Sequence, residues 1–313
     1  MSKRDLVLSV LDGSAPQGPI PAAFFTHFDP SCHFGQAGVD KHLEYIRATD
    51  MDFVKIQYER KFPSDPSVEQ PADWANVKPL TLDHFEPQLS VVRGLVEACK
   101  SEMVVIVTLY SPFMCAGHVG GPERLAAHMA EDPDAVCKGM EIVTESLRLF
   151  VRECVRIGVD GFYHSTQGYE AGRLASRELF HQCVKPYDLS IMEEIDRSCP
   201  FSILHVCDYH EPYDDLSPFP AYPGKVVNVN PVVGERTYTG AEIVDLFGRP
   251  FMGGVDRHGA LARGSEADAR AAAREVLAQL PPNSILAADC TVPPGTPWAN
   301  LRAAIDEAHA WRG

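Results

Sequence analysis

Short apolar runs alternate with helix-like stretches along the 313 residues of the chain. The runs are rich in β-branched residues and are bounded by turn-forming residues, which is typical of buried strands. Eight of them predict strands, at 20–25, 52–58, 103–110, 159–165, 201–207, 225–230, 250–256 and 284–290. Each predicted strand is followed by at least one stretch with apolar residues at helical spacing.

Several of the predicted helices carry start and stop signals. The clearest begins after Asp132, an N-cap followed by Pro133, and ends before Gly158. Capping boxes at 239–242 and 265–268 predict two more helix starts. The remaining helices are expected over 39–49, 86–100, 176–197 and 297–311.

The order of these elements predicts the fold class. Alternating strands and helices indicate a parallel α/β sheet, and eight such units favour a closed (β/α)8 TIM barrel. Periodicity does not distinguish closure from an open doubly wound sheet, but the sequence lacks the glycine-rich phosphate-binding motifs of the nucleotide-binding open folds. No linker divides the chain, so we expect a single domain over 1–313. The loop at 60–82 is long enough to act as a lid.

Composition excludes several classes of partner. The net charge of −15 disfavours nucleic acid and anionic membrane surfaces, because both need a basic face. No stretch of about 18 apolar residues predicts a membrane-spanning helix. The nine cysteines are odd in number and no signal peptide precedes them, so we expect free thiols and a cytoplasmic protein. Most of these thiols should be small buried apolar groups.

Polar side chains gather where the predicted strands end, which is where barrel enzymes build their active sites. They are His27, Tyr58, Glu59, Tyr110, His164, His205, Cys207, Asp256, His258 and Cys290. His205 and Cys207 are two residues apart on one strand, so their side chains face the same way. Together with Cys290 they form a ligand set that suits zinc and leaves one coordination position open, as catalytic zinc sites do. Buried packing is the alternative for each of the three.

Several segments resemble the cobalamin-linked thiol methyltransferases of the uroporphyrinogen decarboxylase superfamily. LHVCD at 204–208 is similar to their H-x-C-G motif, and ADCTVPPGTPWANLRAAIDEA at 288–308 to their closing cysteine, proline-rich turn and helix. YSPFMCAG at 110–117 resembles the family's turn after the third strand, and EDPDAV at 131–136 resembles its helix start. FMGGVD at 251–256 resembles its glycine-bearing strand before the last βα unit. The first hundred residues match in layout only.

The resemblance implies a zinc-dependent methyltransferase that moves a methyl group between a corrinoid and a thiol or other small acceptor. Zinc would be held by His205, Cys207 and Cys290, and the corrinoid would come free or on a separate protein. The other rim residues are candidates of two kinds. Those for catalysis or ligand orientation are His27, Glu59, His164 and Asp256, and those for substrate binding are Tyr58, Tyr110 and His258.

The sequence also departs from the family. The segment THFDPSCHFGQAG lacks the arginines that a decarboxylase needs to hold a tetrapyrrole with many carboxylates. Asp208 stands where the motif has glycine, which could crowd or retune the metal site. A near match to the corrinoid-ligating D-x-H-x-x-G at 256–261 has Leu261 in place of glycine, and we interpret it as coincidence. A metal-independent decarboxylase or lyase, and a non-catalytic corrinoid-binding barrel, remain as alternatives. The methyl donor, the acceptor, the direction of transfer and a homodimer are left open.

Overall fold

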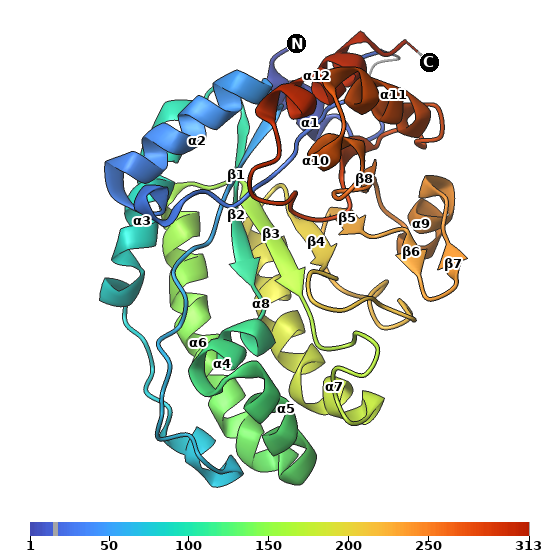
Figure 1. The fold of residues 1–313 in the computed structure, drawn as a ribbon. Coiled ribbons are helices and arrows are strands. Elements are labelled where there is room, and N and C mark those ends of the chain that lie inside the picture. The colour runs from blue at the N-terminus through green and yellow to red at the C-terminus, as the bar shows by residue number, and fades with distance from the viewer. Residues whose placement is uncertain (15–17, 313) are drawn as a thin grey trace.

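The computed structural model describes residues 1–14 and 18–312, and its centre is a curled parallel sheet (Figure 1). The strand order β1-β2-β3-β4-β5-β8-β9 follows the chain, so each strand pairs with its predecessor in the sheet. Seven of the eight predicted strands are regular: β1 Phe53–Ile56, β2 Val104–Tyr110, β3 Gly161–Thr166, β4 Ile203–Val206, β5 Val226–Val229, β8 Phe251–Val255 and β9 Ile285–Ala288.

The first predicted strand, 20–25, closes the barrel without being a regular strand. It lies between β9 and β1: the Ala23 amide donates to the Leu286 carbonyl at 3.1 Å, and the Asp52 amide donates to the Ala22 carbonyl at 3.0 Å. Only one bridge, Ala22 to Leu286, joins it to β9. Pro21 has no N–H to offer a ladder, and the Ala22 amide is taken by the Asp52 carboxylate. The prediction of a (β/α)8 barrel is therefore confirmed.

The helices cover the outside of this sheet (Figure 1). Those that match predicted helices are α2 Gly35–Thr49, α3 Leu82–Cys99, α6 Pro133–Ile157, α7 Arg177–Cys183, α8 Lys185–Ser198, α9 Gly240–Phe247, α11 Glu266–Leu277 and α12 Trp298–Ala310. The Asp132 carboxylate accepts from the Ala135 amide, Gly158 ends α6 in the left-handed conformation, and both predicted capping boxes form. Local start and stop signals were thus sufficient to place these helix ends.

Some elements were not predicted from the sequence. The helix expected over 176–197 breaks into α7 and α8 at Val184, because Pro186 cannot donate to the preceding turn. The segment after β2 forms two helices where we had expected a turn. The unpredicted elements are α1 Lys3–Leu8, α4 Pro112–Gly120, α5 Pro122–Glu131, α10 Ala260–Arg263, the short 3-10 helices η1 Pro30–Cys32 and η2 Pro71–Asn76, and the hairpin strands β6 Val232–Val233 and β7 Arg236–Thr237.

The loop at 60–82 is packed against the body of the protein, as Figure 1 shows beside α6. Its anchor is Trp74, which is fully buried and donates from Nε1 to His128 Nδ1 at 3.0 Å. A Cβ atom at Gly139 of α6 would lie 2.7 Å from the Trp74 ring, so only glycine admits the indole there. The Arg124 guanidinium also donates to the Val68 carbonyl. These contacts tie the loop to α5 and α6 and do not fit the lid that we predicted.

All nine cysteines are free thiols, as expected, and seven of them are buried. No helix in residues 1–14 and 18–312 is both long enough and apolar enough to cross a bilayer.

Candidate metal centre

A cavity of about 470 Å³ opens at the carboxyl ends of the barrel strands. Because side chains alternate along a strand, every second residue points into it. The strand residues that line it are Lys55, Gln57, Thr108, Tyr110, Tyr163, Ser165, Gln167, His205, Cys207 and Cys290. The floor of the cavity is therefore made by polar side chains from β1 to β4 and from the end of β9.

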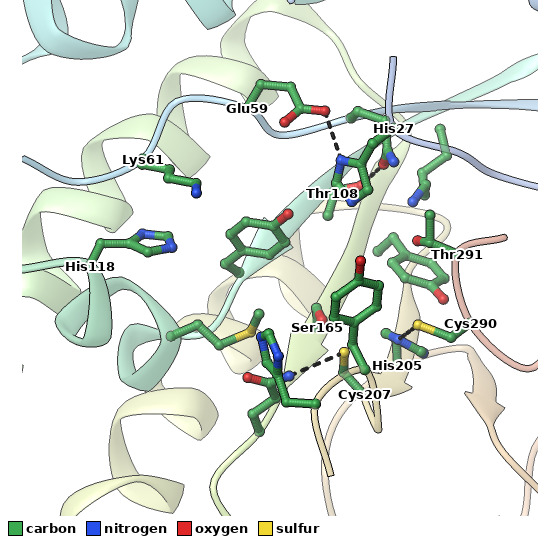
Figure 2. A pocket seen from close by; sticks show the side chains of 18 of the residues that line it. His27, Glu59, Lys61, Thr108, His118, Ser165, His205, Cys207, Cys290 and Thr291 are labelled. Atoms are coloured by element: carbon green, nitrogen blue, oxygen red, sulfur yellow. Dashed lines mark hydrogen bonds and ion pairs between the residues drawn. The ribbon is translucent and has the colours of Figure 1, made fainter. Parts of the chain in front are cut away.

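His205, Cys207 and Cys290 meet at one end of this cavity (Figure 2). The three residues are 2%, 4% and 5% exposed. One potential ligand atom from each lies within 4.8 Å of the others, and the Cys290 Sγ is 3.3 Å from the His205 Nε2. The Gln167 amide lies 3.5 Å from the Cys207 Sγ. The convergence predicted from the strand ends is present in the structure.

Strand pairing explains how the three side chains meet. His205 pairs with Ser165 across β3 and β4, which puts both side chains on the inner face. The Cys207 amide continues this ladder by donating to the Thr166 carbonyl at 3.0 Å, so Cys207 faces inward like His205. The Asp289 amide donates to the Val255 carbonyl and places Cys290 beyond β9 at the same rim.

The three residues fit a tetrahedral zinc ion. With Zn–N and Zn–S bonds of about 2.0 and 2.3 Å, tetrahedral ligands would have nitrogen and sulfur about 3.5 Å apart, close to the 3.3 Å between His205 and Cys290. Tyr163 stacks on the His205 ring, with centroids 4.7 Å apart, and holds its plane. The His205 Nδ1 has no hydrogen-bond partner within the described residues. Three soft donor atoms converge, and a small movement of these side chains would bring all three to bonding distance of one ion.

The Cys207 and Cys290 thiols interact with each other, and this shifts their pKa values in opposite directions. The hydrogen bond from Cys290, opposed by burial, lowers the pKa of Cys207 well below its usual value. The same interaction, together with burial, raises the pKa of Cys290. Cys207 is therefore the thiol of the pair that loses its proton more readily, and a divalent cation would stabilise loss of the proton from Cys290 as well.

A buried ion cluster joins the two cysteine loops behind the site. The Arg257 guanidinium donates through Nη1 to the Asp208 carboxylate at 2.8 Å and to the Asp289 carboxylate at 2.5 Å. The Arg257 amide also donates to Asp289 at 2.8 Å. Asp208 directly follows Cys207, and Asp289 directly precedes Cys290. One cation therefore links the backbone neighbours of two of the three candidate ligands.

Asp208 turns away from the candidate metal centre. Its carboxylate is shared between Arg257 and the Asn230 side-chain amide, which donates at 2.7 Å. The carboxylate that replaces the glycine of the family motif therefore occupies space behind the site and does not crowd it.

His27 and Glu59 form a hydrogen-bonded pair on the cavity wall, as Figure 2 shows. The His27 Nδ1 is 2.8 Å from the Glu59 carboxylate, and the Glu59 amide donates to the Gln88 side chain at 2.9 Å. The second carboxylate oxygen lies 3.9 Å from the His33 Nδ1. A carboxylate that orients an imidazole is a common arrangement for moving protons. Tyr110, another predicted site residue, also lines the cavity.

Four predicted site residues lie elsewhere. Tyr58 is fully buried on the outer side of the sheet, against Phe150 of α6. His164 is the neighbour of Ser165 and so points to the opposite face, where its Nε2 lies 3.8 Å from the Asp188 carboxylate. These two residues are in the helix layer and not among those that line the cavity.

Asp256 and His258 follow β8 but turn away from the cavity. Both are exposed, and the Asp256 carboxylate accepts from the His258 amide at 2.8 Å in a local turn. The His258 Nε2 contacts Arg257 at 3.1 Å. The structure therefore gives them no place beside the candidate ligands.

Four residues at or behind the site were not predicted from the sequence: Lys55, Tyr163, Gln167 and Arg257. Lys55 could have been recognised because it interrupts an apolar strand. Tyr163 and Gln167 each lie two residues from the inward-facing Ser165, so their side chains point to the same face of the strand. No local pattern marks Arg257, because its partners are 49 and 32 residues away along the chain.

Comparisons with known proteins find relatives that match most of the chain. A family model described as Uroporphyrinogen decarboxylase (URO-D) matches residues 48–311. A "Methylated-thiol--coenzyme M methyltransferase" of Methanosarcina mazei is 25% identical over 253 residues, 78% of this chain and 65% of that protein. The matched part is therefore just under two thirds of that relative. "Methylcobamide:CoM methyltransferase MtbA" of the same organism is 24% identical over 250 residues, 79% of this chain and 70% of that protein.

Two solved structures share the fold. A methyltransferase from Methanosarcina mazei superposes with a TM-score of 0.79 at 15% identity, over 98% of both chains. A B12-independent methionine synthase from Shewanella sp. W3-18-1 gives a TM-score of 0.57 at 11% identity, over 93% of this chain and 95% of that one. At these identities the likeness concerns the fold alone.

Proposed function

The chain belongs to the uroporphyrinogen decarboxylase family, and within it we propose that the protein is a zinc-dependent methyltransferase acting between a corrinoid and a thiol or other small acceptor. The convergence of His205, Cys207 and Cys290 at the end of the cavity carries this proposal. Two relatives whose names state methyl transfer to coenzyme M, one of them from a methylcobamide, support it.

His205, Cys207 and Cys290 would hold the ion. When bound there, zinc would supply the Lewis acidity that turns a thiol into a thiolate near neutral pH. Tyr163 keeps the imidazole plane fixed by stacking on it. Arg257 keeps the two cysteine loops together through Asp208 and Asp289. The protein's own part is thus to preorganise three donors and to leave room for a substrate sulfur in the cavity.

The His27–Glu59 pair accepts the proton that the acceptor thiol loses. In the proposed transfer a carbon–sulfur bond forms and the carbon–cobalt bond of the methyl donor breaks, leaving its electron pair on cobalt. Glu59 orients the His27 ring through their 2.8 Å hydrogen bond. The reverse direction, demethylation of a methylated substrate, would use the same pair as the acid.

The cavity wall does not suit a substrate with many carboxylates. The described residues that line it include two lysines, Lys55 and Lys61, and no arginine. Decarboxylation of a tetrapyrrole needs several cations to hold its carboxylates, so the metal-independent alternative has less support than methyl transfer. The corrinoid is expected to arrive free or on a separate protein.

Metal analysis and methyl transfer test the proposal together. We expect about one zinc per chain in protein purified without chelator, and its loss in Cys207→Ser and Cys290→Ser. Zinc-loaded protein should demethylate methylcobalamin in the presence of a small thiol, and both variants should lose this activity.

A buried cysteine outside the cavity provides the matched control. Cys99, at the end of α3, is 6% exposed and does not line the cavity, so Cys99→Ser should keep both zinc and activity. Protein that binds no zinc, with variants that behave like the parent, would contradict the proposal. Zinc bound equally well by the two site variants would do the same.

A further inference from the structure

Two thiols meet in the helix layer, away from the cavity. Cys137 lies in the second turn of α6, and Cys183 is the last residue of α7. Their Sγ atoms are 3.4 Å apart, although 46 residues separate them along the chain. Cys183 is fully buried, whereas Cys137 is partly exposed. Neither residue lines the cavity or belongs to the candidate metal centre.

Contacts beside the two thiols hold the helices in register. The Gln182 side-chain amide donates to the Asp134 carboxylate at 2.8 Å, and the Tyr187 hydroxyl donates to the Cys137 carbonyl at 3.0 Å. The 3.4 Å between the sulfurs exceeds the length of a disulfide bond, about 2.0 Å, by about 1.4 Å, a movement on the scale of side-chain rotation. The fold therefore keeps the two thiols close enough to react with each other.

The two thiols differ in acidity. The hydrogen bond from the Cys183 thiol, opposed by burial, lowers the pKa of Cys137 to about 7. The Tyr187 hydroxyl also lowers this pKa, and the carboxylates of Asp134 and Glu141 oppose it. The same thiol contact, together with burial, raises the pKa of Cys183. The thiolate is the form that attacks an oxidant, so Cys137 is the thiol that reacts first.

Packing alone does not account for this pair. A buried cysteine ordinarily serves as a small apolar group, as Cys154 does farther along α6, where burial raises its pKa. Cys137 is instead partly exposed and in contact with a second thiol. An accessible thiol of low pKa beside another thiol is the arrangement found in redox-sensitive cysteines.

We propose that Cys137 and Cys183 form a peroxide-reactive site that closes to a disulfide between α6 and α7. The Cys137 thiolate attacks one oxygen of hydrogen peroxide, so that an S–O bond forms, the O–O bond breaks and the other oxygen leaves as water. The Cys183 sulfur then attacks the sulfur of the sulfenic acid on Cys137. The S–S bond forms, the S–O bond breaks and a second water leaves. Two thiols thus give up two electrons and two protons to one peroxide, and a dithiol reductant reverses the change.

The disulfide would fasten a segment that borders the candidate metal centre. Residues 167–176 connect β3 to α7 and begin at Gln167, whose amide lies 3.5 Å from the Cys207 Sγ. Their other contact with α7 is the Tyr169 ring, which packs on Phe180 with centroids 4.8 Å apart. The new bond closes the chain around β3 and this connection, which restricts the unfolded chain. Oxidised protein should therefore resist unfolding better than reduced protein.

Peptide mapping after mild oxidation tests the site. The whole chain is reduced, desalted, treated with a small excess of hydrogen peroxide, blocked at its free thiols and cut with trypsin. Cys137 and Cys183 then lie in different peptides, 125–138 and 178–197, and neither peptide contains another cysteine. We expect the two peptides to be joined, with a mass two hydrogens below their sum, and dithiothreitol to separate them.

Three variants separate the roles of the two thiols. Cys183→Ala should stop at a sulfenic acid on Cys137, which dimedone traps, and Cys137→Ala should form neither this adduct nor the joined peptides. Cys32→Ser is the matched control, since Cys32 is the other partly exposed thiol, and it should behave like the parent. Oxidation should raise the thermal midpoint of the parent and of Cys32→Ser by about 5 °C more than that of the two alanine variants.

The mapping is decisive even if a variant fails to fold, because it is made on the parent protein. Joined peptides in the folded parent that dithiothreitol releases, at much lower yield when the chain is first unfolded in urea, would support the site. A folded parent without joined peptides would overturn it, whether Cys137 stays a thiol or is oxidised further to sulfinic acid. Equal yields from folded and unfolded chains would overturn it too, since the fold would then not bring the thiols together. None of these outcomes depends on methyl transfer.

Discussion

Replacing Arg257 by methionine should destabilise the protein and loosen its candidate metal centre. The Arg257 guanidinium bonds the Asp208 and Asp289 carboxylates at 2.8 and 2.5 Å, and the three side chains are only 7–9% exposed. The substitution leaves two buried carboxylates without their shared cation. Loss of one partner from a buried ion pair costs about 3–5 kcal/mol, so we expect a decrease of that size in the free energy of unfolding.

Urea denaturation with chelator present measures this loss without a contribution from bound metal. Burial already raises the pKa of Asp289 in the parent protein, and removal of Arg257 should raise it further. A carboxyl group whose pKa is raised in the folded state costs stability when it ionises at high pH, and this cost disappears when the group is protonated at low pH. The deficit of Arg257→Met should therefore shrink between pH 8 and pH 5.

The triple variant Arg257→Met, Asp208→Asn, Asp289→Asn is the control. It removes all three charges and should recover most of the lost stability, because no uncompensated charge stays buried. A loss below about 1 kcal/mol in Arg257→Met, or no recovery in the triple variant, would refute the argument, since both follow from the unpaired carboxylates.

The same variant should bind zinc less well. Arg257 holds the chain neighbours of Cys207 and Cys290, and loss of such outer contacts commonly costs about 10- to 100-fold in metal affinity. Competition with a chromogenic chelator measures this affinity directly. Equal zinc affinity in parent and variant would mean that the cysteine loops keep their positions without the guanidinium.

Three further predictions concern separate parts of the molecule. Burial raises the pKa of Glu170 to about 7 from 4.5, so ionisation of this carboxyl costs native stability as pH rises from about 4.5 to 7. Glu170→Gln should then be more stable than the parent by up to about 3 kcal/mol at pH 8 and nearly equal to it below about pH 4.5, as measured by urea denaturation. A constant difference in stability across this pH range would contradict the raised pKa of Glu170. Trp74→Ala should lower the free energy of unfolding by about 3–5 kcal/mol, because the indole is fully buried against Gly120 of α4 and Gly139 of α6. A change below about 1 kcal/mol would show that the loop at 60–82 does not depend on it. His27→Gln should reduce kcat for methyl transfer by about a hundredfold with the zinc content unchanged, whereas an unchanged kcat would remove His27 from the proposed proton path.

The strands and most of the helices could be predicted from local signals. β-branched apolar runs, N-caps and capping boxes act over a few residues. They placed both ends of α6 and the starts of α9 and α11 to the residue. The segment 20–25 was recognised too, although Pro21 prevents a regular strand. Helices α4 and α5 were missed because we interpreted the segment after β2 as a turn.

The sequence by itself also determined that His205 and Cys207 share a face, because side chains alternate strictly along a strand. It could not determine which face points inward, since that depends on pairing with neighbouring strands and on the helices that cover the sheet. The pairing of β3 with β4 put Ser165 beside His205 in the cavity and turned His164 to the opposite face of the sheet. Pairing also joined Arg257 to Asp208 and Asp289. It placed the Lys55 ammonium over the rings of Phe25 and Tyr163. Such contacts connect residues far apart in the chain, so only the closed barrel brings them together.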